Sequence, residues 1–420
     1  MKVLVLGGGG REHALAWKLS REPSVSDVYC APGNPGSAAC AINLPVDLRA
    51  PEAVVALVQA RGIDLTVIGP EQPLEAGVAD ALRDAGLAVF GPSRAAARLE
   101  TSKAFAKAFM ERHGVPTGRA RVCTSPVEAE AAIEEFGAPV VIKADGLAAG
   151  KGVTVAATVE QARAAVDAAM RQDLFGDAGR TLLVEECLTG PEVSFFVLCD
   201  GRRALPLATA QDHKRAYDGD LGPNTGGMGA FAPSPLFTLE MAARVMGEII
   251  EPVIRGMRAE GNPYHGFLYA GLMLTAGGPK VIEFNVRFGD PEAQVVLPAL
   301  AGPFAGVLLA AAKGTLRDAP ALEWNGEIFA GVVLASGGYP ASFESGREIS
   351  GLDAGKGDAL LFHAGTARKD GGFVTAGGRV LTVVGRGPAY RAAIDRAYYA
   401  VSQITFDKMH FRTDIGRSAL

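Results

Sequence analysis

The stretch VIKADGLAAGKGV, residues 141 to 153, joins a strand-like apolar run to a glycine-rich loop with a second lysine. β-branched residues precede Lys143, so we expect it at the end of a strand, where a buried cation is costly unless an anion lies close to it. Exposed backbone N–H groups could close on phosphate oxygens in the loop that contains Gly146, Gly150, Lys151 and Gly152. A Walker loop would need Ser or Thr where Gly152 stands. The stretch therefore predicts a different kind of phosphate site, and the alternative is a glycine hairpin with solvated lysines.

The segment PKVIEFNVRFGDPE, residues 279 to 292, could hold a metal ion on a polyphosphate. Alternate side chains of a strand share a face, which predicts Glu283, Asn285 and Arg287 on one face. The opposite face would be apolar and would contain Ile282, Phe284 and Val286. Carboxylate and amide oxygens suit Mg²⁺, and an arginine beside them can neutralise a phosphoryl group during transfer. The alternative is the solvated face of an edge strand.

Two further polar segments could take part in the same site. Residues 211 to 230, QDHKRAYDGDLGPNTGGMGA, are too long for a simple connection and begin with a run of titratable side chains, which favours a functional loop. Residues 181 to 197, TLLVEECLTGPEVSFFV, predict a strand, a turn and a second strand that begins near Glu192. Such a hinge could hold an adenine edge with its backbone and a ribose diol with the carboxylate, or it could be a routine hairpin.

The N-terminal part of the chain, about one hundred residues, predicts a parallel sheet. Short apolar runs of strand type alternate with helical patterns, and this βαβα order favours parallel strands joined by helices. The predicted strands are residues 2–7, 27–31, 65–69 and 88–91, and the predicted helices are residues 13–21, 51–60 and 74–85.

The sequence GGGGRE follows the first predicted strand and raises the question of a dinucleotide site. Its spacing argues against one, because the third glycine of GxGxxG would fall on Glu12 and no acidic residue ends the second strand. Glycines at the start of a helix beside Arg11 suit a phosphate monoester better. The turns APGNPG and GPEQPL follow later strands, and they could serve the same ligand or be ordinary strand-to-helix turns.

The remaining chain predicts three further units. A helical segment over residues 92–116 contains Lys103 and ends in a Gly-x-Pro signal, which is typical of a linker. Residues 117–205 predict a small α+β lobe with five strands, the last near Val193, and residues 239–260 predict a long helix. Beyond Trp324 the pattern mixes α and β. We therefore divide the chain into residues 1–100, residues 101–325 with a small lobe at 118–190, and residues 326–420.

Composition limits the classes of partner. The 420 residues carry 41 Lys and Arg against 46 Asp and Glu, a net charge of −5, which argues against nucleic-acid and anionic-membrane surfaces and favours small-molecule ligands. Five cysteines without a CxxC pair predict reduced thiols rather than zinc ligands. The N-terminus does not resemble a signal peptide, and no apolar run is long enough to span a membrane. We expect a cytoplasmic monomer.

Taken in order along the whole chain, the motifs resemble those of the phosphoribosylamine-glycine ligases (glycinamide ribonucleotide synthetases), an ATP-grasp family of purine biosynthesis. Further matching motifs are GGGGREHALAW, GPS, FGDAG, GPNTGGMGA, GFLYAGLM, GGYP, FHAGT, GGRVL and FRTDIG. The resemblance implies an α/β multidomain protein with a Rossmann-like N-terminal parallel sheet of the biotin carboxylase type, ATP-grasp α+β lobes and a mixed α+β C-terminal domain. It also implies that the chain uses ATP and Mg²⁺ or Mn²⁺ to join glycine to 5-phosphoribosylamine.

The resemblance assigns roles to individual residues. Those implied for ATP are Lys103, Lys143, Gly146, Gly150, Lys151, Gly152, Glu185, Glu186, Leu188 and Glu192. Among them the lysines and glycines would hold phosphates, the segment from Glu185 would contact adenine and Glu192 would bind the ribose. Glu283 and Asn285 would ligate the metal, although the preceding strand, LYAGLML, lacks the additional acid of many ATP-grasp proteins. Those implied for phosphoribosylamine are Gly9, Gly10, Arg11, Asn34, Glu71 and Asp290.

The implied reaction proceeds through glycyl phosphate. The carboxylate of glycine attacks the γ-phosphoryl group of ATP, and the amine of phosphoribosylamine attacks the resulting acyl phosphate, so positioning and charge neutralisation matter more than a general base. We hypothesise that Asp212 pairs with the ammonium of glycine while Arg287 steers its carboxylate, and that Lys143 and Lys214 complete the catalytic set. Alternatively, Asp212 orients His213 or Lys214. Two rival interpretations are another ATP-grasp ligase or carboxylase, and a nucleotide-binding protein without activity.

Overall fold

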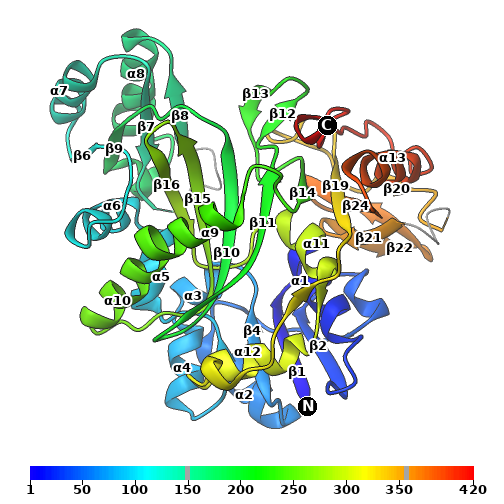
Figure 1. Cartoon of the computed structure of the whole chain (residues 1–420). Helices are drawn as coiled ribbons and strands as arrows, with labels where there is room; N and C mark the ends of the chain where they lie inside the picture. Colours follow the sequence, from blue (N-terminus) through cyan, green and yellow to red (C-terminus); the bar gives the residue numbers. More distant parts are fainter. Residues whose placement is uncertain (147–151, 354–358) are drawn as a thin grey trace.

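The computed structural model describes residues 1–146, 152–353 and 359–420 (Figure 1). Gly150 and Lys151, which the sequence predicts in the phosphate loop, lie outside the described residues. The described chain forms an N-terminal parallel sheet, a small lobe, and a long antiparallel sheet that continues into the C-terminal part. Among the described helices, none is both long enough and apolar enough to cross a membrane.

The N-terminal part contains the parallel sheet that the βαβα pattern predicts, in the order β3-β2-β1-β4-β5. Its strands are β1 (Lys2–Gly7), β2 (Asp27–Pro32), β3 (Ile42–Asn43), β4 (Leu65–Ile68) and β5 (Val89–Phe90). Its helices are α1 (Gly10–Leu19), α2 (Pro51–Arg61), α3 (Gln72–Glu75) and α4 (Val78–Asp84). The single helix predicted over residues 74–85 is wrong, because Gly77 adopts a left-handed φ of 85° that separates α3 from α4.

A small lobe follows the linker helices α5 (Arg94–Thr101) and α6 (Lys103–Arg112). Its antiparallel sheet has the order β6-β9-β7-β8, with strands β6 (Ala120–Cys123), β7 (Val140–Ala144), β8 (Val153–Ala156) and β9 (Leu182–Glu186). Helices α7 (Pro126–Phe136) and α8 (Val159–Val166) pack against this sheet. α7 begins after Ser125, whose hydroxyl caps it, and ends at Gly137, which has a positive φ of 70°.

The long sheet has the order β16-β15-β10-β11-β14-β19-β24-β21, and every pairing in it is antiparallel. The strands are β10 (Glu192–Asp200), β11 (Ala204–Asp212), β14 (Gly229–Ala232), β15 (His265–Thr275), β16 (Gly278–Asn285), β19 (Ile328–Ala335), β21 (Ala359–His363) and β24 (Arg379–Gly387). β10 is the strand predicted near Val193 in the small lobe. That assignment is wrong, because a local pattern does not show which sheet a strand will join.

Shorter elements complete the chain. The hairpin strands are β12 (Arg215–Tyr217) and β13 (Leu221–Asn224), and the small sheets contain β17 (Leu300–Ala301), β18 (Glu323–Trp324), β20 (Glu348–Ile349), β22 (Thr366–Lys369) and β23 (Gly372–Thr375). The remaining helices are α9 (Leu239–Val245), α10 (Glu251–Ala259), α11 (Glu292–Val296), α12 (Phe304–Ala312) and α13 (Tyr390–Val401). A π-helical turn over residues 246–250 joins α9 to α10, so the long helix predicted over residues 239–260 is present.

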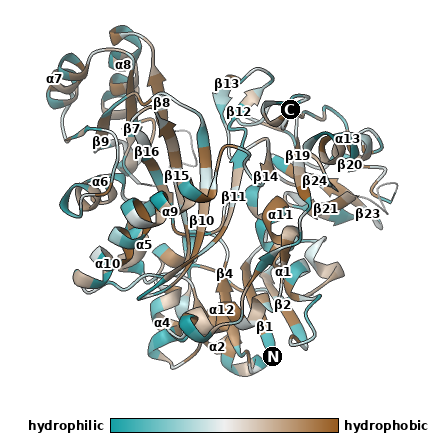
Figure 2. Ribbon diagram, viewed as in Figure 1, coloured by the Kyte–Doolittle hydropathy of each residue, from teal (hydrophilic) through white to brown (hydrophobic). Residues whose placement is uncertain are grey.

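The hydrophobic cores divide the molecule into a large body and the small lobe. In the body, the N-terminal and long sheets share their cores: the ring of Phe267 on β15 lies 4.8 Å from that of Phe90 on β5, between ring centroids. Figure 2 shows apolar residues along the strands of both sheets. The lobe has a core of its own, whose buried residues all lie between Cys123 and Val184. Contacts other than this core must therefore hold the lobe against the body.

Candidate active site

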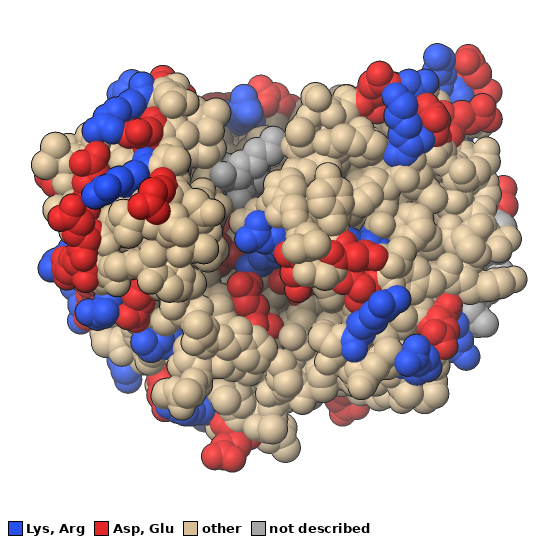
Figure 3. Space-filling model, turned by 90° about the horizontal axis from the view of Figure 1, so that it is seen from above, with Lys and Arg blue, Asp and Glu red and all other residues tan. Residues whose placement is uncertain are grey.

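A cavity of about 1640 Å³ lies between the small lobe, the long sheet and turns of the N- and C-terminal parts. Figure 3 shows charged side chains gathered around this hollow. Most of the predicted site residues line it, namely Arg11, Glu71, Lys103, Lys143, Gly146, Gly152, Glu185, Glu186, Leu188, Glu192, Asp212, Lys214, Glu283, Asn285, Arg287 and Asp290. Segments far apart in the sequence thus contribute to one cavity.

Lys143 lies in β7 and is 5% exposed, as the apolar run around it predicts. Its Nζ lies 2.8 Å from Oε2 of Glu185 and donates to the carbonyl of Ile282 at 3.1 Å. The anion beside this lysine in the structure is therefore a protein carboxylate. Lys103, at the start of α6, donates from its Nζ to the carbonyl of Gly146 at 2.7 Å, so it touches the first part of the predicted phosphate loop.

In the segment predicted to bind adenine, the acidic side chains pair with cations of the protein. Glu185 is 6% exposed and faces lysines. Glu186 lies 3.0 Å from Nε of Arg119 and 3.2 Å from Nζ of Lys280. Leu188 lines the cavity beside them. The backbone of this segment and Leu188 are therefore better placed than the two carboxylates to contact a base.

The predicted metal ligands lie on one side of β16, but the alternation is interrupted. Gly271 of β15 pairs with Glu283 while Leu272 pairs with Val281, which leaves Ile282 as a bulge residue. Ile282 is half-buried and lines the cavity, so its predicted place on the opposite face is wrong. Asn285 does lie on the cavity side, and its Oδ1 accepts from the guanidinium of Arg287 at 3.4 Å.

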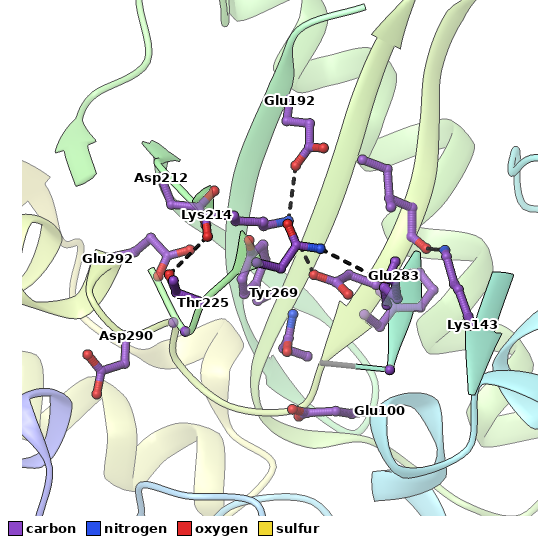
Figure 4. A pocket seen from close by; sticks show the side chains of 18 of the residues that line it. Glu100, Lys143, Glu192, Asp212, Lys214, Thr225, Tyr269, Glu283, Asp290 and Glu292 are labelled. Carbon is purple, nitrogen blue, oxygen red and sulfur yellow. Dashed lines mark hydrogen bonds and ion pairs between the residues drawn. The ribbon is translucent and has the colours of Figure 1, made fainter. Parts of the chain in front are cut away.

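Lys214 lies between two carboxylates that line the cavity, those of Glu192 and Glu283 (Figure 4). Its Nζ lies 3.0 Å from Oε2 of Glu192 and 3.4 Å from Oε1 of Glu283. The positive charge of Lys214 lowers the pKa of Glu283, and the charges of Lys143 and Lys103 add to this shift, while burial acts in the opposite direction. This carboxylate is therefore ionised at neutral pH. A hard, ionised oxygen donor beside an amide oxygen suits a magnesium ion on a polyphosphate. No cluster of three His, Cys, Asp or Glu side chains that could bind a metal occurs among the described residues.

Asp212 ends β11 close to the same lysine. Burial raises the pKa of Asp212 to about 8, while Lys214 opposes this shift and Glu292 adds to it. The carboxyl of Glu292 is itself buried and accepts from the hydroxyl of Ser194 at 3.3 Å. A cationic group placed against Asp212 would lower its pKa and favour the carboxylate form.

Arg287 is clamped between two carboxylates from different parts of the body. Its Nε lies 3.0 Å from Glu71, in the GPEQPL turn, and its Nη2 lies 3.0 Å from Glu100, in α5. Glu100 also accepts from the backbone N–H of Val286 at 2.7 Å. The arginine therefore fixes the N-terminal turn against the long sheet, in addition to facing the cavity.

The N-terminal glycine loop already surrounds an anion of the protein itself. Glu12 is 2% exposed, and its Oε2 accepts from the backbone N–H of Gly9 at 2.6 Å. Its Oε1 lies 2.6 Å from Nε of Arg11. A Cβ at Gly7 or Gly69 would meet the Glu12 side chain within 2.5 Å, so the glycines here make room for this carboxylate. A phosphate bound within the loop would be repelled by Glu12, which argues against the predicted phosphate monoester site there.

Asn34 lies behind this loop and joins it to the C-terminal part. Its Nδ2 donates to the carbonyls of Gly8 at 2.9 Å and His363 at 2.8 Å, and its Oδ1 accepts from the backbone N–H of Gly36 at 2.8 Å. Neither Gly9, Gly10 nor Asn34 lines the cavity, unlike the other residues predicted for phosphoribosylamine. These three residues therefore contribute to the shape of the turn and not to the wall of the cavity.

Two buried histidines complete this junction between the N- and C-terminal parts. Nδ1 of His13 accepts from the backbone N–H of His363 at 2.9 Å, and their ring centroids lie 5.8 Å apart. Burial lowers the pKa of His13 to about 3, with His363 adding to the shift, and burial with Arg368 lowers the pKa of His363 to about 4. Both rings are neutral in the folded protein at neutral pH.

We expect the protein to lose stability below pH 6.5 because of these two histidines. Their folded pKa values lie below the unfolded value, so unfolding takes up protons, and the stability is complete above pH 6.5 and lost as the pH falls toward 4. The loss at pH 5.5 should be about 1 kcal/mol per histidine. Urea unfolding at pH 7.5 and 5.5 measures it, and His13→Asn, which keeps an acceptor, should reduce the pH dependence by about 1 kcal/mol, while the buried His213 and His265, whose pKa values burial also lowers, keep their own contributions. An unchanged pH dependence in this variant would contradict the assignment.

Sequence reasoning missed several residues of the site. Lys107, Glu12, Glu100 and Glu292 are all buried or nearly buried charged side chains at or next to the cavity. Lys107 follows Lys103 by one helical turn, which places both on the same side of a helix and is a signal that could have indicated it. Glu12 is the third residue of α1 and accepts from the backbone N–H of Gly9, which is a local capping signal that could have indicated it. For Glu100 and Glu292 the sequence carries no comparable signal, because their partners lie far away in the chain.

Comparison with known proteins gives a consistent family. The three models of phosphoribosylglycinamide synthetase match in order: its N domain at residues 1–100, its ATP-grasp (A) domain at residues 101–293 and its C domain at residues 329–418. The phosphoribosylamine-glycine ligase of Ralstonia nicotianae is 51% identical over 421 residues and covers 100% of both chains. That of Rhizobium meliloti is 51% identical over 420 residues and covers 100% of this chain and 99% of its own.

Solved structures agree with these matches. The crystal structure of phosphoribosylamine-glycine ligase from Thermotoga maritima is 34% identical, covers 99% of this chain and all of its own, and has a TM-score of 0.86. The biotin carboxylase domain of 2-oxoglutarate carboxylase from Hydrogenobacter thermophilus, solved with MgADP and bicarbonate, is 19% identical over 98% of this chain and 91% of its own with a TM-score of 0.73, which shows the shared fold. The chain therefore belongs to the phosphoribosylglycinamide synthetase family, with the multidomain ATP-grasp fold predicted from its motifs.

Proposed function

We propose that this chain joins glycine to 5-phosphoribosylamine at the expense of ATP, and that it releases glycinamide ribonucleotide, ADP and phosphate. The observation that carries the proposal is the family match over the whole chain. The cavity supports it, because lysines from three segments face carboxylate and amide oxygens across one space. This is the arrangement that phosphoryl transfer requires.

We assign Lys103, Lys143, Gly146 and Gly152 to the phosphates of ATP. Gly150 and Lys151 of the predicted phosphate loop lie outside the described residues, and their assignment rests on the family resemblance. Leu188 and the backbone after Glu185 and Glu186 would contact adenine, because the two carboxylates face cations of the protein. Glu192 would bind the ribose diol, for which its carboxylate oxygens are suitable acceptors.

A divalent cation fits the donors at Glu283 and Asn285, and we propose Mg²⁺ or Mn²⁺ there. The carboxylate is ionised at neutral pH, and the neighbouring amide oxygen is a second hard donor. When bound, such an ion neutralises charge on the phosphates and supports in-line transfer. Lys214 lies 3.4 Å from Glu283, so the same carboxylate also keeps a cationic side chain beside the phosphates.

The remaining assignments concern glycine and phosphoribosylamine. Asp212 would hold the ammonium of glycine, which keeps that amine unreactive while the carboxylate attacks ATP. Arg287 would face the glycine carboxylate, and Lys214 would neutralise charge that develops on the phosphoryl group. Arg11, Glu71 and Asp290 line the cavity, and we assign them to phosphoribosylamine. We assign Gly9, Gly10 and Asn34 to the shape of the turn behind that surface.

The organisation of the chain is part of the proposal. We divide it at residues 1–100, 101–325 and 326–420, with the small lobe at 118–190, although the long sheet crosses the second of these boundaries. We propose a monomer in the cytoplasm. The five cysteines, all of which are described, are free thiols, which supports a reducing compartment. Light scattering of the purified protein would test the oligomeric state.

Omitting one substrate at a time tests the function. The full mixture of ATP, divalent cation, glycine and phosphoribosylamine should release ADP, and omission of glycine should abolish this release. A carboxylase of the same fold would instead respond to bicarbonate and not to glycine. ADP release that bicarbonate supports and glycine does not would reject the ligase assignment.

Asp212→Asn should raise the KM for glycine by about tenfold or more and leave the KM for ATP nearly unchanged. The reason is that the amide removes the charge that would hold the ammonium group of glycine. The residues that we assign to ATP, such as Lys103 and Lys143, are not changed. Steady-state kinetics with each substrate varied in turn measure both constants. If Asp212 only orients Lys214 or His213, kcat will fall with both KM values little changed, and that result would contradict our assignment.

A further inference from the structure

Lys107 is among the most buried lysines of the molecule, and neither the sequence motifs nor the proposed reaction gives it a role. It lies in α6 and is 3% exposed. Its Nζ donates to Oγ1 of Thr117 at 2.8 Å and to the carbonyl of Gly118 at 3.0 Å, and lies 3.3 Å from Oε1 of Glu185. A buried cation is costly, so each of these contacts offsets a real penalty.

These contacts span both connections between the body and the small lobe. Thr117 and Gly118 lie where the chain passes from α6 into the lobe, and Glu185 lies at the end of β9, where it leaves the lobe. The hydroxyl of Thr117 in turn donates to the carbonyl of Val281 in β16 at 2.7 Å. Because the lobe has a hydrophobic core of its own, contacts of this kind contribute to its position relative to the body.

The carboxylate of Glu185 is shared between two lysines. Oε1 faces Lys107 at 3.3 Å, and Oε2 faces Lys143 at 2.8 Å. With formal charges, this row of three side chains carries a net charge of +1. Without Lys107 the net charge would be zero, and the negative charge of Glu185 would act on Lys143 alone.

We propose that Lys107 is a positioning residue for ATP: it shares the charge of Glu185, so that Lys143 keeps an uncompensated positive charge for the phosphates. The same contacts hold Lys143 at a fixed place across the cavity from Glu283. This inference rests on the proposed use of ATP and adds a residue that lines the cavity but whose Nζ is engaged by Thr117, Gly118 and Glu185.

Other contacts of α6 agree with this role. At the start of the helix, the carboxylate of Asp145, just before the predicted phosphate loop, accepts from the backbone N–H of Ala104 at 3.1 Å and from the hydroxyl of Ser102 at 3.2 Å. Lys103 donates to the carbonyl of Gly146. One helical turn later, Lys107 holds the row that contains Lys143. α6 thus fixes both described parts of the phosphate side of the cavity.

The test compares the binding of ADP and adenosine to purified full-length variants by calorimetry. In Lys107→Met, ADP should bind roughly tenfold more weakly because the row loses its net charge, while adenosine, which has no phosphates, should keep its affinity within about twofold. Adding Glu185→Gln to this variant restores the formal charge of +1. The double variant should therefore regain most of the affinity for ADP.

Two controls separate positioning from general damage. Lys18→Met removes another partly buried lysine, which donates to the carbonyl of Leu300 outside the cavity, and should leave both affinities unchanged. Lys107→Arg keeps the charge and should keep the preference for ADP over adenosine even if it lowers stability.

Three outcomes would overturn the inference. They are equal losses for ADP and adenosine in Lys107→Met, a double variant as weak as the single one, or a folded Lys107→Arg with the same loss as Lys107→Met. If Lys107→Met does not fold, Lys107→Arg is compared with the parent protein, and loss of its preference for ADP over adenosine would overturn the inference. Failure of the proposed function would be recognised by a different result, namely the absence of glycine-dependent ADP release in the parent protein. The binding assay is independent of that result, because it uses neither glycine nor phosphoribosylamine.

Discussion

Replacing Lys143 by methionine should lower kcat/KM for ATP by about 30- to 1000-fold, or about 2–4 kcal/mol, which is the scale of one preorganised electrostatic contact. Lys143 is suited to such a contact because its Nζ is held by Glu185 and by the carbonyl of Ile282 before any ligand arrives. Methionine preserves the length of the buried stem, so the main change is the loss of the charge and its hydrogen bonds. Steady-state ATP titrations measure the effect.

The same substitution at Lys280 provides the matched control. Lys280 lies on β16 and pairs with Glu186 at 3.2 Å, but it does not line the cavity. Lys280→Met should therefore change kcat/KM by less than about threefold, as expected for a partly exposed ion pair. Near-parental turnover of folded Lys143→Met, or equal losses in the two variants, would remove Lys143 from the ATP site.

Glu283→Gln should raise the concentration of Mg²⁺ needed for half-maximal activity by about 10- to 100-fold. Glutamine keeps the shape of the side chain but removes the negative charge, and Lys214, Lys143 and Lys103 keep that charge present in the parent at neutral pH. Activity titrated with Mg²⁺ at saturating ATP measures the shift. Overlapping titrations of variant and parent would show that the metal binds elsewhere.

Lys214→Met distinguishes loss of a metal ligand from loss of an ion pair. Glu283 lies 3.4 Å from Lys214, so either substitution breaks that pair. Only Glu283→Gln should raise the Mg²⁺ requirement, whereas Lys214→Met should lower activity without raising it. A raised requirement in both variants would mean that the ion pair, and not metal ligation, explains the effect. Glu248→Gln, on an exposed helical segment, controls for the chemical change alone.

The charged side chains of the cavity are arranged in pairs and rows rather than singly. Lys143 lies against Glu185, Lys214 lies between Glu192 and Glu283, and Arg287 lies between Glu71 and Glu100. Such rows hold charges at fixed positions, which is the condition for electrostatic stabilisation of a transition state. They also explain why single substitutions at these positions should not act additively.

Local signals in the sequence predicted much of the fold and many of the cavity residues. The βαβα alternation predicted the parallel sheet, and Ser125, Pro126 and Gly137 together determine the bounds of α7. The polar residues Glu283 and Asn285 were placed on the cavity side of a strand, as the structure has them. These predictions succeed because caps, turns and side-chain periodicity act between residues that are close in the chain.

Only the tertiary structure decided which charges meet. Arg287 lies two residues after Asn285 in sequence, but its partners Glu71 and Glu100 are about two hundred residues away, and nothing local to either partner indicates the other. The bulge at Ile282 arises from pairing with β15, so a pattern read from one strand could not show it. The sequence alone assigns the glycines near Arg11 to a phosphate, whereas in the structure the carboxylate of Glu12 lies among them and also against Gly69 of a later turn. Sequence determined the elements and the kinds of chemistry, and long-range packing determined which groups remain free to perform it.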